Sequence, residues 1–92
     1  MSVAQQPTTT LFFGNLDQNV SREMLFEIGI QAGPITSVTI PIDQTSGKNK
    51  GFGFMDYETL ESAVYALNLF SGNLTLFGKE VRIAYSPRGR PA

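Results

Sequence analysis

The chain has 92 residues, with no cysteine and no histidine. This length suits one domain, and an apolar fraction of 41 % is typical of a folded chain. Without these two residue types there is no disulfide framework, thiolate metal site or imidazole acid–base, which excludes zinc fingers and Ser-His-Asp hydrolases. The sequence predicts no cofactor and no metal, and because no apolar run reaches membrane-spanning length, it predicts no membrane partner.

The charge is nearly balanced, with 7 basic and 8 acidic residues and a formal net charge of −1. Such a balance argues against nucleic-acid binding through bulk positive charge. Arg22 is the one basic residue of the first half, and the others follow Gly47: Lys48, Lys50, Lys79, Arg82, Arg88 and Arg90. If the fold separates these residues from the acidic side chains of the helices, a neutral chain can still present one basic face.

The first half of the chain predicts a tail, a strand, a helix and a second strand. Residues 1–9 are polar and lack an apolar period, which indicates a flexible N-terminal tail. Residues 11–16 are apolar and aromatic, as in a short strand. Ser21 is an expected helix N-cap, with Gly33-Pro34 as the stop. Residues 35–41 then alternate between apolar and polar side chains, which predicts a half-buried strand.

The second half predicts a loop, a strand and a second helix. Residues 43–49 are polar and indicate a mobile loop, and residues 51–57 form a glycine-rich aromatic strand. Thr59 is the expected N-cap of a helix that Ser71-Gly72-Asn73 ends. The apolar period of that helix runs through Ala63, Ala66, Leu67 and Phe70.

The last part predicts a short extended piece at 74–77, a turn at 78–79, a final strand at 80–85 and a flexible C-terminal tail at 87–92. The order β-α-β-β-α-β is that of the α+β, ferredoxin-like fold, a four-stranded antiparallel sheet with both helices on one face. We expect the domain to span residues 10–86.

Alternation along the strands places aromatic rings on the face that the helices leave open. If Phe13 is buried under the helices, its neighbour Phe12 points to the opposite side. In residues 50–57, the alternative register would bury Lys50 and Asp56, which costs more free energy than exposing phenylalanine. The predicted open face therefore carries Phe12, Phe52 and Phe54.

Three exposed rings on one small sheet require an explanation, and unstacked bases supply one. Residues 11–16, Leu-Phe-Phe-Gly-Asn-Leu, resemble the RNP2 motif of the RNA recognition motif (RRM) family. Residues 50–57, Lys-Gly-Phe-Gly-Phe-Met-Asp-Tyr, resemble its RNP1 motif, with Met55 where valine is usual. The resemblance covers about Thr10 to Ser86.

This resemblance implies a site for single-stranded RNA. Phe12, Phe52 and Phe54 take the family positions whose rings contact bases or ribose, and Lys50 takes the position that pairs with phosphate. Arg82 is a second cation that is expected to contact a phosphate. Asn15 either contacts a base or caps a turn, and the basic tail residues Arg88 and Arg90 either follow the RNA backbone or stay solvated.

A second hypothesis is a protein-interaction module with weak or no RNA binding. Gly29 stands inside a predicted helix, where this family more often has a bulky apolar residue. Close approach at Gly29, with Phe26 or Ile30 exposed beside it, would form a docking groove on the helical face. Residues 31–34 and 76–78 also resemble a subgroup that includes a splicing factor 3b subunit and a nuclear exosome adaptor subunit, which implies a protein partner and a nuclear location.

A third hypothesis is a ferredoxin-like hydrolase such as acylphosphatase, which needs an arginine between the first strand and the first helix. Residues 14–21 contain none, so an enzyme is not expected. The sequence thus favours a single RRM, monomeric in isolation, that binds single-stranded RNA on its sheet and acts in nuclear RNA processing, either splicing or RNA decay.

Overall fold

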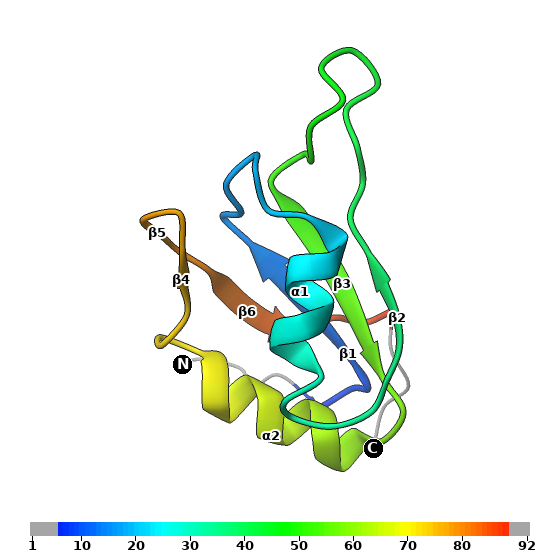
Figure 1. Ribbon diagram of the computed structural model, residues 1–92. Coiled ribbons are helices and arrows are strands. Elements are labelled where there is room, and N and C mark those ends of the chain that lie inside the picture. The colour runs from blue at the N-terminus through cyan, green and yellow to red at the C-terminus, as the bar shows by residue number, and fades with distance from the viewer. Residues whose placement is uncertain (1–5, 89–92) are drawn as a thin grey trace.

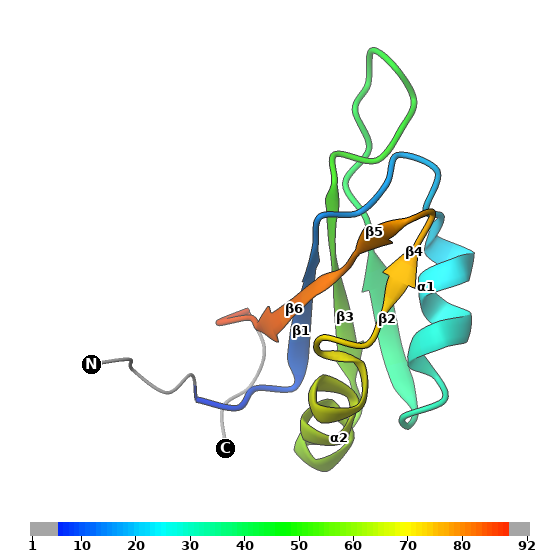
Figure 2. The same ribbon diagram turned by 90° about the vertical axis from the view of Figure 1, so that its left-hand side faces the viewer.

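The computed structural model describes residues 6–88, which form a four-stranded antiparallel sheet with two helices on one side (Figure 1). The sheet has the order β2-β3-β1-β6. Its strands are β1 (Thr10–Gly14), β2 (Ile35–Thr39), β3 (Phe52–Tyr57) and β6 (Arg82–Tyr85), and the helices are α1 (Arg22–Gly29) and α2 (Leu60–Phe70). Figure 2 shows both helices on the same side and no helix on the other. The predicted ferredoxin-like arrangement is confirmed.

Both helices begin where the sequence predicts. The Ser21 hydroxyl accepts a hydrogen bond from the Met24 N–H, and the Thr59 hydroxyl accepts one from the Ser62 N–H, so each cap satisfies a donor that the first turn leaves open. The first helix ends earlier than predicted. After Ile30 the chain continues in tight turns up to Gly33, because the N–H groups of residues 31–33 bond three residues back instead of four.

The predicted last strand over 80–85 is divided in two. Glu80 pairs with Thr75 in a small separate hairpin, β4 (Thr75–Leu76) with β5 (Lys79–Glu80), and only residues 82–85 join the main sheet. Val81 lies between them, buried, with its N–H donating to the Leu74 carbonyl. The strand is divided because this bond holds Val81 against Leu74, next to the hairpin, before the chain enters the main sheet.

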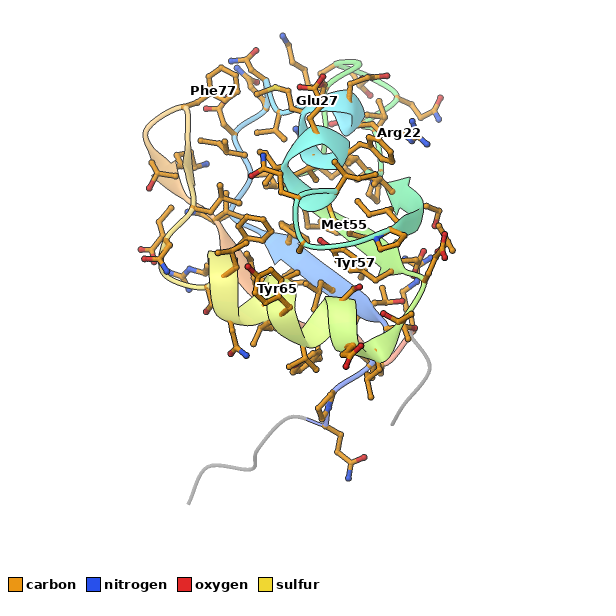
Figure 3. All side chains as sticks on the ribbon, turned by 60° about the horizontal axis from the view of Figure 1, so that its bottom comes forward. Arg22, Glu27, Met55, Tyr57, Tyr65 and Phe77 are labelled. Atoms are coloured by element: carbon orange, nitrogen blue, oxygen red, sulfur yellow. The ribbon has the colours of Figure 1, made fainter. Side chains whose placement is uncertain are left out.

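The core between helices and sheet depends on a close approach at Gly29. A Cβ atom there would lie 2.1 Å from the Met55 sulfur, so the missing side chain makes room for a longer one on β3. Beside it, the Tyr57 hydroxyl donates to the Gly29 carbonyl at 2.7 Å, and burial raises the pKa of Tyr57. Figure 3 shows Met55 and Tyr57 on the helical side of β3. Gly29 and Met55, the two residues that differ from the usual pattern of the resembled family, therefore pack directly against each other.

The N-terminal boundary lies earlier than predicted. Thr8 and Thr9, assigned to the flexible tail of residues 1–9, are both buried. The Thr8 hydroxyl donates to the Ser86 carbonyl at 2.7 Å, and the Thr9 carbonyl accepts from the Tyr57 N–H at 2.8 Å. These bonds continue the sheet beyond β1, so the tail assignment was wrong for these two residues. The predicted tail residues 1–5 and 89–92 lie outside the described part of the chain.

Candidate nucleic-acid interface

The side of the sheet away from the helices carries three rows of side chains, because directly paired residues of antiparallel strands point to the same face. Gly14 pairs with both Phe52 and Arg82, which sets these three in one row. The next row pairs Ala84, Phe12, Phe54 and Thr39, and the last consists of Thr10, Asp56 and Ser37. The strand register therefore brings the predicted rings together.

The three phenylalanines form one cluster, the open-face cluster of Phe12, Phe52 and Phe54. The Phe12 ring centre lies 6.1 Å from that of Phe52, with the planes inclined by 24°, and 5.7 Å from that of Phe54. The Phe52 and Phe54 rings lie edge to face at 5.9 Å. All three are half-buried, whereas Phe13, Met55 and Tyr57 on the other face are at most 1 % exposed. The cluster thus keeps aromatic surface open to solvent.

Gly14 sets the position of the Phe12 ring. A Cβ atom at Gly14 would lie 2.7 Å from a ring carbon of Phe12, so the ring lies over the bare glycine backbone. On β6, the residue paired with Phe12 is the small Ala84. Sequence reasoning missed this role of Gly14, although a glycine between aromatic residues in a strand is the signal for such a close approach.

Asp56 lies on the open face, as alternation predicts, but it is not isolated there. Its two carboxylate oxygens accept hydrogen bonds from the hydroxyls of Thr10 and Ser37, on the strands either side. Hydroxyl donors from both neighbours stabilise the carboxylate at the end of the sheet. This carboxylate marks the end of the aromatic surface where a phosphate would be repelled.

The two predicted phosphate contacts lie at the opposite end. Arg82 is exposed, and its pairing with Gly14 places it on the open face in the row of Phe52. Lys50 is exposed but lies outside β3, and Gly51, with φ of 95°, separates it from Phe52. Strict alternation therefore does not determine which way the Lys50 side chain points. In the sequence, Lys50 is two residues before Phe52 of the cluster.

Asn15 has a structural contact. Its backbone has φ of 59°, and its side-chain amide donates to the Glu80 carbonyl at 2.8 Å. This bond ties the end of β1 to the β4–β5 hairpin, as expected for an asparagine in the left-handed region. This long-range contact is neither of the two alternatives that the sequence left open, so a base contact of Asn15 stays a prediction.

Arg88 contributes a contact on the open face that sequence reasoning did not specify. Its guanidinium carbon lies 4.2 Å from the centre of the Phe54 ring, within cation–π range. No local pattern announces this contact, because it depends on how the chain turns after β6. Arg90 lies outside the described residues.

On the helical face, the two apolar side chains that the sequence places beside Gly29 are both exposed, but Gly29 itself forms no groove there. Phe26, on the outside of α1, is 37 % exposed, and Ile30, the C-cap residue four positions later, is 44 % exposed beside it. A shallow hollow beside Phe26 is lined by Arg22, Glu23 and Glu27. Gly29 is buried against Met55, so it faces the core and not this hollow.

Within residues 6–88, neither a metal-binding cluster nor a membrane-spanning helix is found. No group of three or more acidic, histidine or cysteine side chains there is arranged to hold a metal ion. Among the helices of the same residues, none is long and apolar enough to cross a membrane.

Residues 11–82 match the family model of the RNA recognition motif. The chain belongs to this family. It is 42 % identical over 85 residues to RNA-binding protein 7 of Danio rerio, covering 92 % of this chain and 33 % of that protein. It is 35 % identical over 81 residues to splicing factor 3B subunit 4 of Caenorhabditis elegans, covering 88 % and 21 %. The chain spans a third or less of the length of these curated relatives.

A solved structure of the Rna15 RRM with bound RNA (GU) superposes with a TM-score of 0.81 at 22 % identity, covering 88 % of this chain and 85 % of that one. At this identity the match supports the fold. The family assignment and the subgroup resemblance predicted from the sequence are confirmed, and this RRM is homologous to RNA-binding and splicing proteins.

Proposed function

We propose that this RRM binds single-stranded RNA by stacking bases or ribose on the open-face cluster, in nuclear RNA processing. The observation that carries the proposal is the cluster itself, in which rings from β1 and β3 lie within 6.1 Å of each other on the face without helices. Half-exposed rings leave apolar surface in water, and a nucleobase covers it with its own π-face. Splicing or RNA decay follows from the relatives' names and the subgroup resemblance.

Stacking supplies most of the affinity in this proposal. Each base stacked on an aromatic side chain contributes about 1–3 kcal/mol, and this term needs no net positive charge. Lys50 and Arg82, both exposed near Phe52, contact phosphates and add a salt-dependent part. With a net charge of −1, long-range attraction is small, so affinity depends on the rings.

A titration of short single-stranded RNA against Phe52→Ala tests the stacking role. We expect the variant to lose about 1–3 kcal/mol of binding free energy and to stay folded, because the ring is not fully buried. Phe26→Ala is the matched control, since it removes an exposed ring from the helical face and leaves the cluster intact. Equal affinity of wild type and Phe52→Ala would refute the role of the ring.

A second candidate function is the docking of a protein on α1, in addition to RNA binding. Exposure of Phe26 and Ile30 as an adjacent apolar pair favours it. Gly29 serves this surface indirectly, by letting α1 lie close to Met55. Fluorescence or NMR titration with candidate partner peptides tests it, with Ile30→Glu expected to abolish binding and Phe52→Ala expected to leave it unchanged.

A further inference from the structure

The chain after β6 turns onto the open face and covers one of its rings. Arg88 is exposed, and its guanidinium carbon lies 4.2 Å above the centre of the Phe54 ring. Figure 2 shows the chain leaving β6 on the side of the sheet away from the helices. A planar cation at this distance occupies the same face of the ring that a stacked base would need.

Hydrogen bonds hold the start of this segment in place. Ser86 is only 3 % exposed, its N–H donates to the Thr10 carbonyl at 2.8 Å, and its carbonyl accepts from the Thr8 hydroxyl at 2.7 Å. The Arg88 N–H then donates to the Ser86 hydroxyl at 3.2 Å, which folds the chain back within two residues. The anchor is buried and hydrogen-bonded, whereas the arginine beyond it is exposed and makes its ring contact from the solvent side.

We propose that Arg88 is an intramolecular competitor for the base position on Phe54. In the RNA-free protein its guanidinium stacks on the ring, and RNA must displace it to use Phe54. An exposed cation–π contact is weaker than base stacking, so RNA displaces Arg88 from the ring. The displacement costs free energy, which lowers the affinity that stacking on Phe54 would otherwise give. The inference rests on the proposed function, because it assumes that bases stack on the open-face cluster.

Arg88→Lys tests the competition, because lysine keeps the positive charge but lacks the planar group that stacks. If Arg88 competes, Arg88→Lys binds a short single-stranded RNA more tightly than wild type, by up to about fivefold, because the ammonium keeps only part of the exposed cation–π contact that the guanidinium makes. If Arg88 instead pairs with phosphate, Arg88→Lys leaves the affinity unchanged or lowers it, and the proposal is overturned. Arg22→Lys makes the same exchange on α1 and is expected to leave the RNA affinity unchanged.

The effect must also depend on Phe54. In a Phe54→Leu background, Arg88→Lys should no longer change RNA affinity, because the stacking partner is gone; an undiminished effect there contradicts the proposal. An NMR measurement without RNA tests the contact itself: the Arg88 side-chain protons should show ring-current shifts that Phe54→Leu removes, and their absence overturns the competition. Normal wild-type binding with an unaltered Arg88→Lys affinity refutes this inference alone, whereas no binding by wild type refutes the proposed function as well.

Discussion

The two faces of the four-stranded sheet differ in what their side chains contribute, although the same strands build both. On β1, Phe13 is fully buried under the helices and its neighbour Phe12 is half-buried on the open side. On β3, Met55 is buried and Phe54 is half-buried in the same alternation. Phenylalanine therefore stabilises the core on one face and leaves exposed aromatic surface on the other, where we propose that RNA binds.

Among the substitutions that we propose, the largest change is expected when Phe13 and Phe12 are each replaced by alanine in separate variants. Phe13→Ala should lower the free energy of unfolding by about 3–5 kcal/mol, because it leaves a cavity in the core. Phe12→Ala should cost about 1 kcal/mol of stability, from its ring contacts, and about 1–3 kcal/mol of RNA binding. Urea denaturation and RNA titration measure the two. Similar stability losses for both variants would contradict the division between the faces.

A medium effect concerns the covered face alone. Gly29→Leu should lower the free energy of unfolding by about 1–3 kcal/mol, because its side chain would collide with Met55. Combined with Met55→Ala, which makes room, the loss should be smaller than the sum of the two single losses, as denaturation of all three variants would show. Strict additivity would mean that the two positions do not compensate.

The smallest expected effect concerns charge at the edge of the open face. Lys50→Ala should weaken binding of all single-stranded sequences alike and reduce the slope of log affinity against log salt by about 0.7, the contribution of one phosphate contact. Titrations at several salt concentrations measure this slope. A slope equal to that of wild type would show that Lys50 makes no phosphate contact.

Sequence reasoning predicted the open face well because alternation is local. The choice between burying Lys50 and Asp56 or exposing the phenylalanines decides the register of β3 without any knowledge of other strands. The direction of Lys50 could not be predicted in the same way, since Gly51 adopts a positive φ and interrupts the alternation.

Local sequence patterns could not predict the features that depend on residues far away in the chain. The buried position of Thr8 depends on Ser86, 78 residues away, and the Arg88 contact depends in turn on that anchor. Gly29 signalled a close approach, but its partner Met55 belongs to another element, so the sequence did not show that the approach is internal. Tertiary contacts decide all of these.

RNA binding by the open-face cluster can be tested by chemical-shift mapping of the intact chain with a pool of random short RNA oligonucleotides. We expect saturable shifts at β1 and β3, centred on Phe12, Phe52 and Phe54, with the amides of α1 unaffected. Silence on these strands, or shifts confined to the helices, would contradict an RNA-binding role for the open-face cluster.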